Sequence, residues 1–217
     1  MTESPPKRQN RYWHDYIADG GSWRKKNGLP PGEDLAAMRA GLGREAGTVP
    51  ALWPYYRAPV NDWLARRGEL SAEQHAEHAA LALFGLHQQS KDQPMHRDGR
   101  SLGAAIRALR DHEVQRALAQ RRSADDGARP VDRLMDTVAT ATSLPVLLRH
   151  LRSTVPRLRE ISQPLDYDRL ARDLHDYQYP DRRTAVRRRW GLDYYGWSLS
   201  DPSRPSPIEP SDPGATP

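Results

Sequence analysis

Two adjacent pairs of histidine and aspartate, His14-Asp15 and His175-Asp176, are the residues of this sequence most suited to metal-assisted chemistry. An imidazole beside a carboxylate can hold a divalent metal that activates water, and helical metal-dependent phosphohydrolases use such pairs. The enzyme that these pairs suggest is therefore a phosphohydrolase with a bound divalent metal.

Three further carboxylates lie near the second pair, but each has a simpler structural explanation. Asp166 and Asp168 occupy positions where a helix N-cap and a first-turn acid belong. Asp173 is close in sequence to Arg169 and Arg172, which can neutralise it. A structural role for these acids is favoured, and the enzyme is the less favoured alternative.

A second possible metal motif consists of His75 and His78, with Glu77 between them, on one side of a predicted helix. HxxH spacing alone is a weak signal, and no cysteine or other obvious ligand is near. We expect an exposed histidine pair beside a stripe of Ala and Leu. The glycines of residues 41–47 have the wrong spacing for a dinucleotide loop and indicate a helix end. The sequence therefore predicts no catalysis, no cofactor and no metal.

Arginine dominates the charged residues. The sequence has 33 Lys+Arg, of which four are lysines, and it carries a net charge of +5 with a pI near 9.6. A guanidinium group is planar and permanently charged, and its five N–H donors suit phosphate oxygens better than a lysine ammonium does. A polyanion is therefore the first partner to consider. The alternative is that an Arg-rich and Ala-rich composition reflects only a GC-rich genome.

The spacing of the arginines favours a polyanion partner. On one predicted helix, Arg149 and Arg152 fall on a single flank of the apolar stripe. A second run, made of Arg182, Arg183 and Arg187, has only one acid close by. A face that is merely solvated would carry Asp or Glu partners four residues away. These arginines are therefore predicted to contact phosphates.

The elements that must position these side chains are helices, because apolar residues recur at helical spacing along most of the chain. Ser71 and Gln74 form a capping-box pattern that opens one helix. Pro130 is expected in the first turn of another helix, and Gly191 is expected to end the last one. Alternating β-branched runs are absent from the sequence. The prediction is an all-α fold, a compact bundle of seven or eight short helices.

Most of the aromatic residues gather in three groups along the chain. The groups are Tyr12, Trp13, Tyr16 and Trp23; Trp53, Tyr55, Tyr56 and Trp63; and Trp190, Tyr194, Tyr195 and Trp197. We expect them to fill gaps between short helices, and base stacking is the alternative.

The two ends of the chain differ in composition from the middle. Residues 1–10 are predicted to form a flexible arm, and the Pro- and Ser-rich residues 198–217 a disordered tail. Residues 11–197 are expected to form one helical domain. The lack of cysteine, of a visible signal peptide and of a membrane-spanning run favours a soluble cytoplasmic protein with no membrane partner.

Five stretches, taken in order, resemble the small subunit of the type I-E CRISPR surveillance complex Cascade, the CasB family. They are AGLGREAGTVPALWPYYR (40–57), ALFGLHQ (82–88) with SLGAAIRAL (101–109), TATSLPVLLRHLR (140–152), LDYDRLARDLHDYQ (165–178) and RRRWGLDYY (187–195). The resemblance is carried by the order and spacing of these stretches across residues 12–195, and no single motif among them is catalytic.

This resemblance implies an all-helical, non-enzymatic subunit of the Cascade complex that contains CRISPR RNA. Its partners would be the CasA and CasC subunits, a second copy of itself placed head to tail, and target DNA, chiefly the displaced non-target strand. The basic surface implied by the family falls on Arg39, Arg44, Arg133, Arg149, Arg152, Arg182, Arg183 and Arg187. Two alternatives stay open: a phosphohydrolase that uses His175-Asp176, and a stand-alone helical DNA-binding regulator with a recognition helix.

Overall fold

The computed structural model describes residues 10–196. Within that range the chain is all-α, with two isolated β-bridges and no strand. Its helices are α1 (Trp13–Tyr16), α2 (Gly32–Ala40), the 3₁₀ helix η1 (Pro50–Tyr55), α3 (Asp62–Ala65), α4 (Ala72–Gln88), α5 (Leu102–Ala119), α6 (Ala124–Thr140), α7 (Leu144–Glu160), α8 (Tyr167–Tyr177) and α9 (Pro180–Tyr195). None of these helices is both long and apolar enough to cross a membrane.

The all-α prediction is confirmed, although the described helices are more numerous and in part longer than expected. The four helices α4 to α7 are each 17 or 18 residues long. The capping box predicted at Ser71 and Gln74 is present at the start of α4. The predicted tail of residues 198–217 and all but the last residue of the predicted arm lie outside the described residues.

Two predicted helix ends are wrong. α6 begins well before Pro130, because Ser123 and Asp126 form a second capping box that satisfies two backbone N–H groups. α9 continues through Gly191 to Tyr195 and is capped by Gly196, whose left-handed backbone (φ 60°) suits glycine. In both places another capping signal a few residues away, the Ser123–Asp126 capping box or Gly196, determines where the helix begins or ends.

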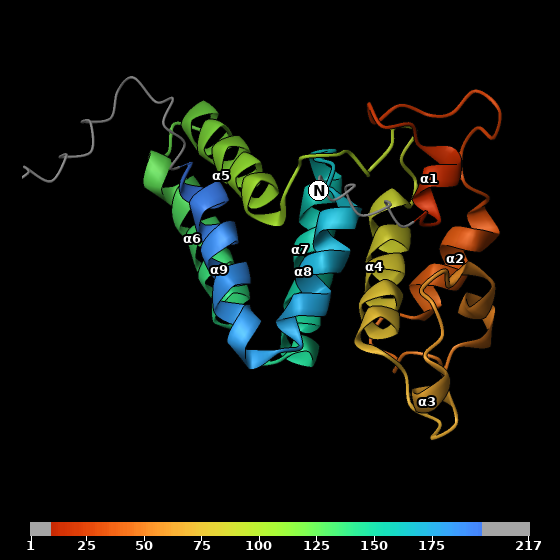
Figure 1. Ribbon diagram of the computed structural model, residues 1–217. Coiled ribbons are helices and arrows are strands. Elements are labelled where there is room, and N and C mark those ends of the chain that lie inside the picture. The colour runs from red at the N-terminus through yellow and green to blue at the C-terminus, as the bar shows by residue number, and fades with distance from the viewer. Residues whose placement is uncertain (1–9, 197–217) are drawn as a thin grey trace, which may run out of the picture.

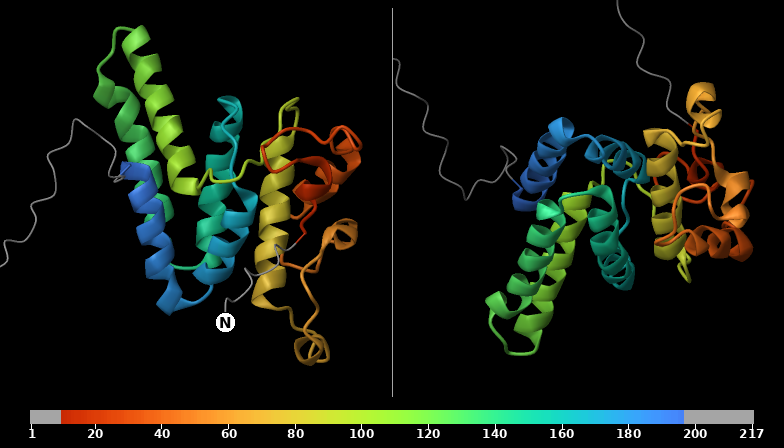
Figure 2. Two further views of the ribbon diagram at one scale, coloured as in Figure 1. Left: turned by 45° about the horizontal axis from the view of Figure 1, so that its top comes forward. Right: turned by 90° about the horizontal axis from the view of Figure 1, so that it is seen from below.

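The helices form three neighbouring groups (Figure 1). α5, α6 and α9 pack together in one group, α7 and α8 lie next to them, and α4 follows with α2 and η1 on its other side. The two further views show the same order, with the α5–α6 pair pointing away from the N-terminal helices (Figure 2). As a result, α7 and α4 lie between segments that are far apart in sequence.

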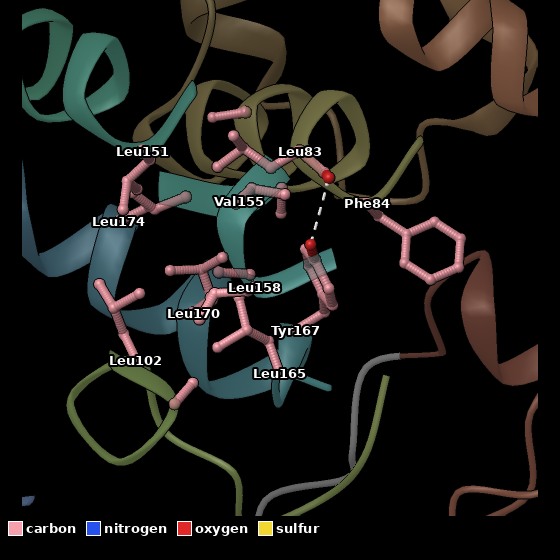
Figure 3. Packing of buried hydrophobic residues seen from close by; sticks show 14 of the residues in the cluster. Leu83, Phe84, Leu102, Leu151, Val155, Leu158, Leu165, Tyr167, Leu170 and Leu174 are labelled. Carbon is pink, nitrogen blue, oxygen red and sulfur yellow. Dashed lines mark hydrogen bonds between the residues drawn. The ribbon is translucent and has the colours of Figure 1, made fainter. Parts of the chain in front are cut away.

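The core lies where α4, α7 and α8 meet, and it is apolar (Figure 3). Leu151 and Val155 of α7 and Leu174 of α8 are fully buried there. Full burial of each such side chain contributes about 1.5–3 kcal/mol. The buried Tyr167 also contributes a polar contact, because its hydroxyl donates to the carbonyl of Leu83 at 3.1 Å. The predicted stripes of α7 and α8 are therefore the faces that hold this region together.

Two glycines permit helices of the C-terminal group to approach closely. A Cβ atom on Gly103 of α5 would overlap the backbone carbonyl of Trp190 in α9. A Cβ atom on Gly127 of α6 would overlap the carbonyl of Glu113 in α5. Gly191 differs, because an added Cβ there would meet nothing within 4 Å.

Replacement of Gly103 and of Gly191 by alanine should therefore have opposite effects on the stability of the protein. Gly103→Ala must push α5 away from α9, at a cost of about 1–3 kcal/mol in the free energy of unfolding. Gly191→Ala in the same helix pair should stabilise the protein by about 0.5–1 kcal/mol, because alanine is the better helix former. Urea denaturation followed by circular dichroism measures both changes. Equal effects of the two substitutions would contradict the close approach.

A buried histidine makes the fold sensitive to acid. His87 of α4 is fully buried, and its Nδ1 lies 3.0 Å from the Tyr167 hydroxyl. Burial lowers the pKa of His87 from 6.5 to about 3, and the nearby charges of Arg159 and Lys91 act in the same direction. Burial likewise lowers the pKa of His78 and of His96. The folded protein thus keeps these imidazoles neutral.

The free energy of unfolding should fall as the pH is lowered below 6.5, because only the unfolded chain then takes up these protons. The contribution of His87 is complete above pH 6.5 and is lost progressively towards pH 3. At pH 5 this one residue should reduce stability by about 2 kcal/mol. Urea titrations between pH 5 and 7.5 measure the slope, and His87→Gln should flatten it while lowering stability at neutral pH. A slope unchanged by His87→Gln would contradict this assignment.

Candidate nucleic-acid interface

Two of the predicted interface residues, Arg149 and Arg152, lie on the exposed side of α7. The opposite side of the helix is fixed in the core by Leu147, Leu151 and Val155, which are all fully buried. Ser143 caps the start of the helix by accepting from the Val146 N–H. α7 therefore holds both guanidinium groups on the solvent side of a firmly packed helix.

The loop after α2 meets the same face of α7. Arg44 lies in this loop and is exposed, and the guanidinium group of Arg152 lies directly against the neighbouring Gly43. Arg39 is in the last turn of α2, just before the loop. Arg133 is exposed on α6, which packs against α7. The fold thus brings Arg152 against the residue that precedes Arg44, although α7 and this loop are far apart in sequence.

Polar contacts fix the loop of residues 41–47. The Gly47 N–H donates to the Tyr56 hydroxyl at 3.3 Å, and that hydroxyl lies 2.6 Å from Nδ1 of His78. Nε2 of His78 in turn lies 3.1 Å from the carbonyl oxygen of Gly41. The Tyr56 hydroxyl proton and the His78 Nε2 proton can satisfy this chain from end to end.

This arrangement corrects the prediction that His75 and His78 form an exposed pair. His75 is half-buried, whereas only 4% of His78 is exposed. His78 tolerates burial because both of its ring nitrogens have a partner, supplied by Tyr56 and by Gly41. Burial lowers the pKa of His78, which favours its neutral form. His78 therefore has a structural role, because it holds the loop of residues 41–47 that carries Arg44.

The three predicted arginines of α9 are engaged within the protein. Arg183 donates to the carbonyls of Tyr177 (3.2 Å) and Thr142 (2.5 Å). Arg187 donates to the Tyr177 hydroxyl (3.3 Å) and to the carbonyl of Ala141 (2.6 Å). Arg182 lies over the ring of Tyr179 and 3.5 Å from Asp176. The contacts of Arg183 and Arg187 tie α9 to the turn between α6 and α7, and those of Arg182 tie it to the end of α8.

The other five predicted arginines have no such partners. Within residues 10–196, the guanidinium groups of Arg39, Arg44, Arg133, Arg149 and Arg152 form no hydrogen bond or ion pair. Some exposed arginines elsewhere are neutralised, as Arg129 is by Asp125 at 3.0 Å and Arg122 by Asp126 at 3.7 Å. Others, such as Arg66, Arg121 and Arg188, also have no guanidinium partner among the described residues. We call the five residues the arginine surface; its positive charge is free to bind an anion.

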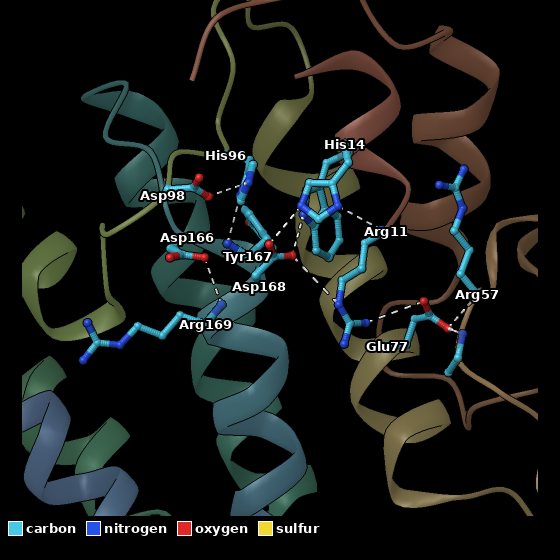
Figure 4. A network of polar contacts seen from close by, with 12 residues as sticks. Arg11, His14, Arg57, Glu77, His96, Asp98, Asp166, Tyr167, Asp168 and Arg169 are labelled. Carbon is cyan, nitrogen blue, oxygen red and sulfur yellow. Dashed lines mark hydrogen bonds and ion pairs between the residues drawn. The ribbon is translucent and has the colours of Figure 1, made fainter. Parts of the chain in front are cut away.

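A buried polar network joins the N-terminal segment to α4 and α8 (Figure 4). Asp168 of α8 accepts from Nε1 of Trp13 (3.0 Å) and lies 2.9 Å from Nε2 of His14. Arg11 lies between two acids, 3.9 Å from Asp168 and 3.6 Å from Glu77. Burial alone would raise the pKa of Asp168, but its contacts with His14 and Trp13 hold that pKa at about 2. The network therefore keeps Asp168 ionised inside the protein.

Two groups in this network have the composition of a metal site: His14, His96 and Asp168, and His96 with Asp98 and Asp166. Nδ1 of His14 accepts from the Arg11 N–H at 3.0 Å, and Nδ1 of His96 accepts from the Tyr167 N–H at 3.1 Å. In a neutral imidazole the proton must then be on Nε2, which consequently has no lone pair for a metal. The Nε2 atoms point at Asp168 and Asp98 instead, as hydrogen-bond donors.

The two pairs His14-Asp15 and His175-Asp176 do not come together. His14 contacts Asp168 in the first turn of α8, whereas His175 is in the last turn of that helix, about 10 Å further along its axis. His175 lies near Glu73 and Asp176, and Asp15 pairs with Arg57. The alternative of a phosphohydrolase built from these pairs therefore gains no support from the geometry.

The aromatic residues divide into two classes. Trp13, Tyr177 and Trp190 are fully buried and fill the core as predicted, with Tyr177 stacked on Trp190 at 5.6 Å between ring centroids. Trp53 and Trp63 are different, since 55% and 63% of these residues are exposed. No sequence signal separates the two classes, because the tryptophans of both occur in similar aromatic clusters. Trp197 lies outside the described residues.

Comparisons with known proteins agree with this architecture. No curated protein sequence matches the chain. The structure of CasB from Thermobifida fusca matches with a TM-score of 0.55 and 26% identity, over 76% of this chain and 84% of that one. CasB from Thermus thermophilus matches with a TM-score of 0.51 and 25% identity, over 76% and 86% of the two chains.

A CRISPR-associated protein of the Cse2 family, also from Thermus thermophilus, is similar to the same degree, with a TM-score of 0.52 and 25% identity over 76% of this chain and 86% of that chain. The family model for CRISPR-associated protein Cse2 matches residues 34–195, which include every helix from α4 to α9 and all eight predicted interface arginines. The chain therefore belongs to the Cse2 family of CRISPR-associated proteins, whose solved members include CasB.

Proposed function

We propose that this chain is a non-catalytic subunit of the CRISPR Cascade surveillance complex and that it holds the displaced non-target DNA strand of the R-loop. The observation that carries the proposal is that the guanidinium group of Arg152 lies against Gly43, the residue before Arg44, while Arg149 is exposed on the same helix; all three arginines have free guanidinium groups. Phosphate oxygens are the ligands that such groups bind best. The Cse2 fold supplies the context of RNA-guided DNA recognition.

The energetics of strand exchange explain why such a surface is useful. An RNA–DNA heteroduplex is about as stable as the DNA duplex that it replaces, so small protein contributions decide whether the R-loop persists. Arginines that bind the backbone of the expelled strand disfavour its re-annealing. Because they contact phosphates and not base edges, they act on any target sequence.

The eight arginines divide into two roles in this proposal. The arginine surface (Arg39, Arg44, Arg133, Arg149 and Arg152) contacts phosphates. Arg183 and Arg187 position α9 against the turn that precedes α7, and Arg182 positions it against the end of α8, because their guanidinium groups already bind carbonyls, a ring and a carboxylate.

The partners in this proposal are those of a Cascade subunit. They are the complex that contains CRISPR RNA, its CasA and CasC subunits, a second copy of this chain placed head to tail, and the target DNA. The proposal places the assembly in the cytoplasm, where it would meet invading DNA.

The double substitution Arg149→Ala, Arg152→Ala should weaken binding of the purified protein to single-stranded DNA. Each direct phosphate contact that is lost should lower the salt slope of the affinity by about one unit, because fewer counterions are released. Fluorescence anisotropy with a labelled oligonucleotide at several salt concentrations measures this slope. Stability should change by only about 0.5 kcal/mol per exposed site, which circular dichroism checks.

The matched control for this experiment is the pair Arg122→Ala, Arg129→Ala. It removes the same charge from exposed positions, but from arginines that are already paired with Asp126 and Asp125. The control should leave the salt slope close to that of the wild type. If both pairs of substitutions lower the slope equally, binding depends on net charge alone and the proposed surface is wrong.

In the assembled complex, Arg149→Ala, Arg152→Ala should permit assembly but shorten the lifetime of the R-loop. Permanganate footprinting reports unpaired thymines of the displaced strand, and their reactivity should decrease in the variant complex. Mass measurement of the complex confirms that the subunit is present. Unchanged footprints in a fully assembled complex would show that these arginines are only a solvated face.

A further inference from the structure

Trp53 presents its indole ring to solvent next to the loop of residues 41–47, which carries Arg44. More than half of the residue (55%) is exposed. Its ring is nevertheless fixed, because Nε1 donates to the carbonyl oxygen of Gly47 at 2.8 Å. A large aromatic side chain usually stabilises a protein through its burial. An exposed but immobilised tryptophan therefore contributes little to the stability of the fold.

The 3₁₀ helix that carries Trp53 is held on both sides of this residue. Leu52 is fully buried, and the hydroxyl of Tyr55 donates to Asp34 at 2.7 Å. Pro54 restricts the backbone directly after the tryptophan. The Tyr56 hydroxyl joins the same segment to the loop of residues 41–47. The ring of Trp53 is therefore pre-organised in its exposed position.

The loop that anchors Trp53 is the one that carries Arg44. Gly47 is three residues beyond Arg44, which limits the separation of the two to about 11 Å along the chain. Arg152 lies against Gly43 of that loop. An exposed indole is thus anchored to the loop that carries Arg44 and is contacted by Arg152. Single-stranded nucleic acids require this combination: cations for the backbone and an aromatic face for the bases.

We propose that Trp53 is a stacking platform for an unpaired nucleobase of the strand whose phosphates the arginine surface binds. This inference rests on the proposed function and deepens it, since it makes the surface selective for single strands over duplex. The occupant is a single strand and not a protein, because the unpaired cations Arg44 and Arg152 at this loop outnumber its one acid without an ion pair, Glu45; the nearby Glu69 is paired with Arg67. Bases in a duplex are already stacked and cannot use this platform.

Trp63 serves as the matched control. It is at least as exposed (63%), but the guanidinium group of Arg67 lies 4.7 Å from its ring centroid and occupies one face. Its neighbours lie in α3 and the following turn, and Arg67 is paired there with Glu69 at 2.9 Å. Removal of Trp63 should therefore test the general effect of losing an exposed tryptophan.

The experiment compares wild type, Trp53→Ala, Trp53→Phe and Trp63→Ala in binding to oligo(dT) and to a DNA duplex of equal length. Trp53→Ala should weaken oligo(dT) binding at least about fivefold, the lower end of what one stacked base contributes. Its salt slope should stay unchanged, because no charge is removed. Duplex affinity should also stay unchanged. Trp53→Phe keeps a ring and loses the hydrogen bond to Gly47, so it should retain most of the affinity.

Other outcomes would overturn the proposal. Equal losses for oligo(dT) and duplex, or equal losses for Trp53→Ala and Trp63→Ala, would mean that the substitution acts through the structure of the loop. If the Trp53→Ala subunit binds oligo(dT) like the wild type but no longer assembles into the complex, the indole contacts a protein and not a base. If Trp53→Ala binds normally while Arg149→Ala, Arg152→Ala does not, stacking is wrong and the proposed function stands. If neither variant loses affinity, both are wrong.

Discussion

α4 is buried around nearly its whole circumference, and this constraint determines how the other helices are arranged. Small residues such as Ala76, Ala80 and Gly85 leave its surface smooth, so neighbours can approach closely on every side. A Cβ atom on Gly85 would collide with Met38 and with the backbone of α2. A helix of this kind needs partners on opposite faces. α2 covers one face and α7 with α8 cover another, which brings the loop after α2 next to α7.

The polar groups that are buried around α4 are nearly all satisfied, and they connect the N-terminal segment to the later helices. Glu77 accepts from the backbone N–H groups of Arg57 (2.9 Å) and Ala58 (2.7 Å), and Arg11 lies between Glu77 and Asp168. An unpaired charge in such a position would lower the free energy of unfolding by several kcal/mol, whereas a paired one favours a single arrangement of the N-terminal segment against α4 and α8. The clusters of histidine and aspartate that look catalytic in the sequence are parts of this pairing.

The arginines illustrate how one residue type takes on different tasks within the same chain. Arg183 and Arg187 find carbonyl acceptors at the turn before α7, so part of their hydrogen-bonding capacity is used within the fold. Arg149 and Arg152 find none among the described residues and keep their charge available. Sequence spacing treats the two sets alike, since both are arginine runs on helices with few nearby acids.

The all-α class, the capping box of α4, and the buried and exposed sides of α7 could all be predicted from the sequence, because they depend on the local periodicity of apolar residues and on short capping motifs. Membership of the Cse2 family was also predictable, through the order of several stretches. The burial of His78, the contact of Arg152 with Gly43, the internal binding of the α9 arginines and the exposure of Trp53 became visible only in the folded chain. Each of these depends on a partner that is distant in sequence, such as Gly41 for His78 or Ala141 for Arg187. The helical period shows which side of a helix faces the core, but the identity of the group that meets a side chain follows from how the helices pack.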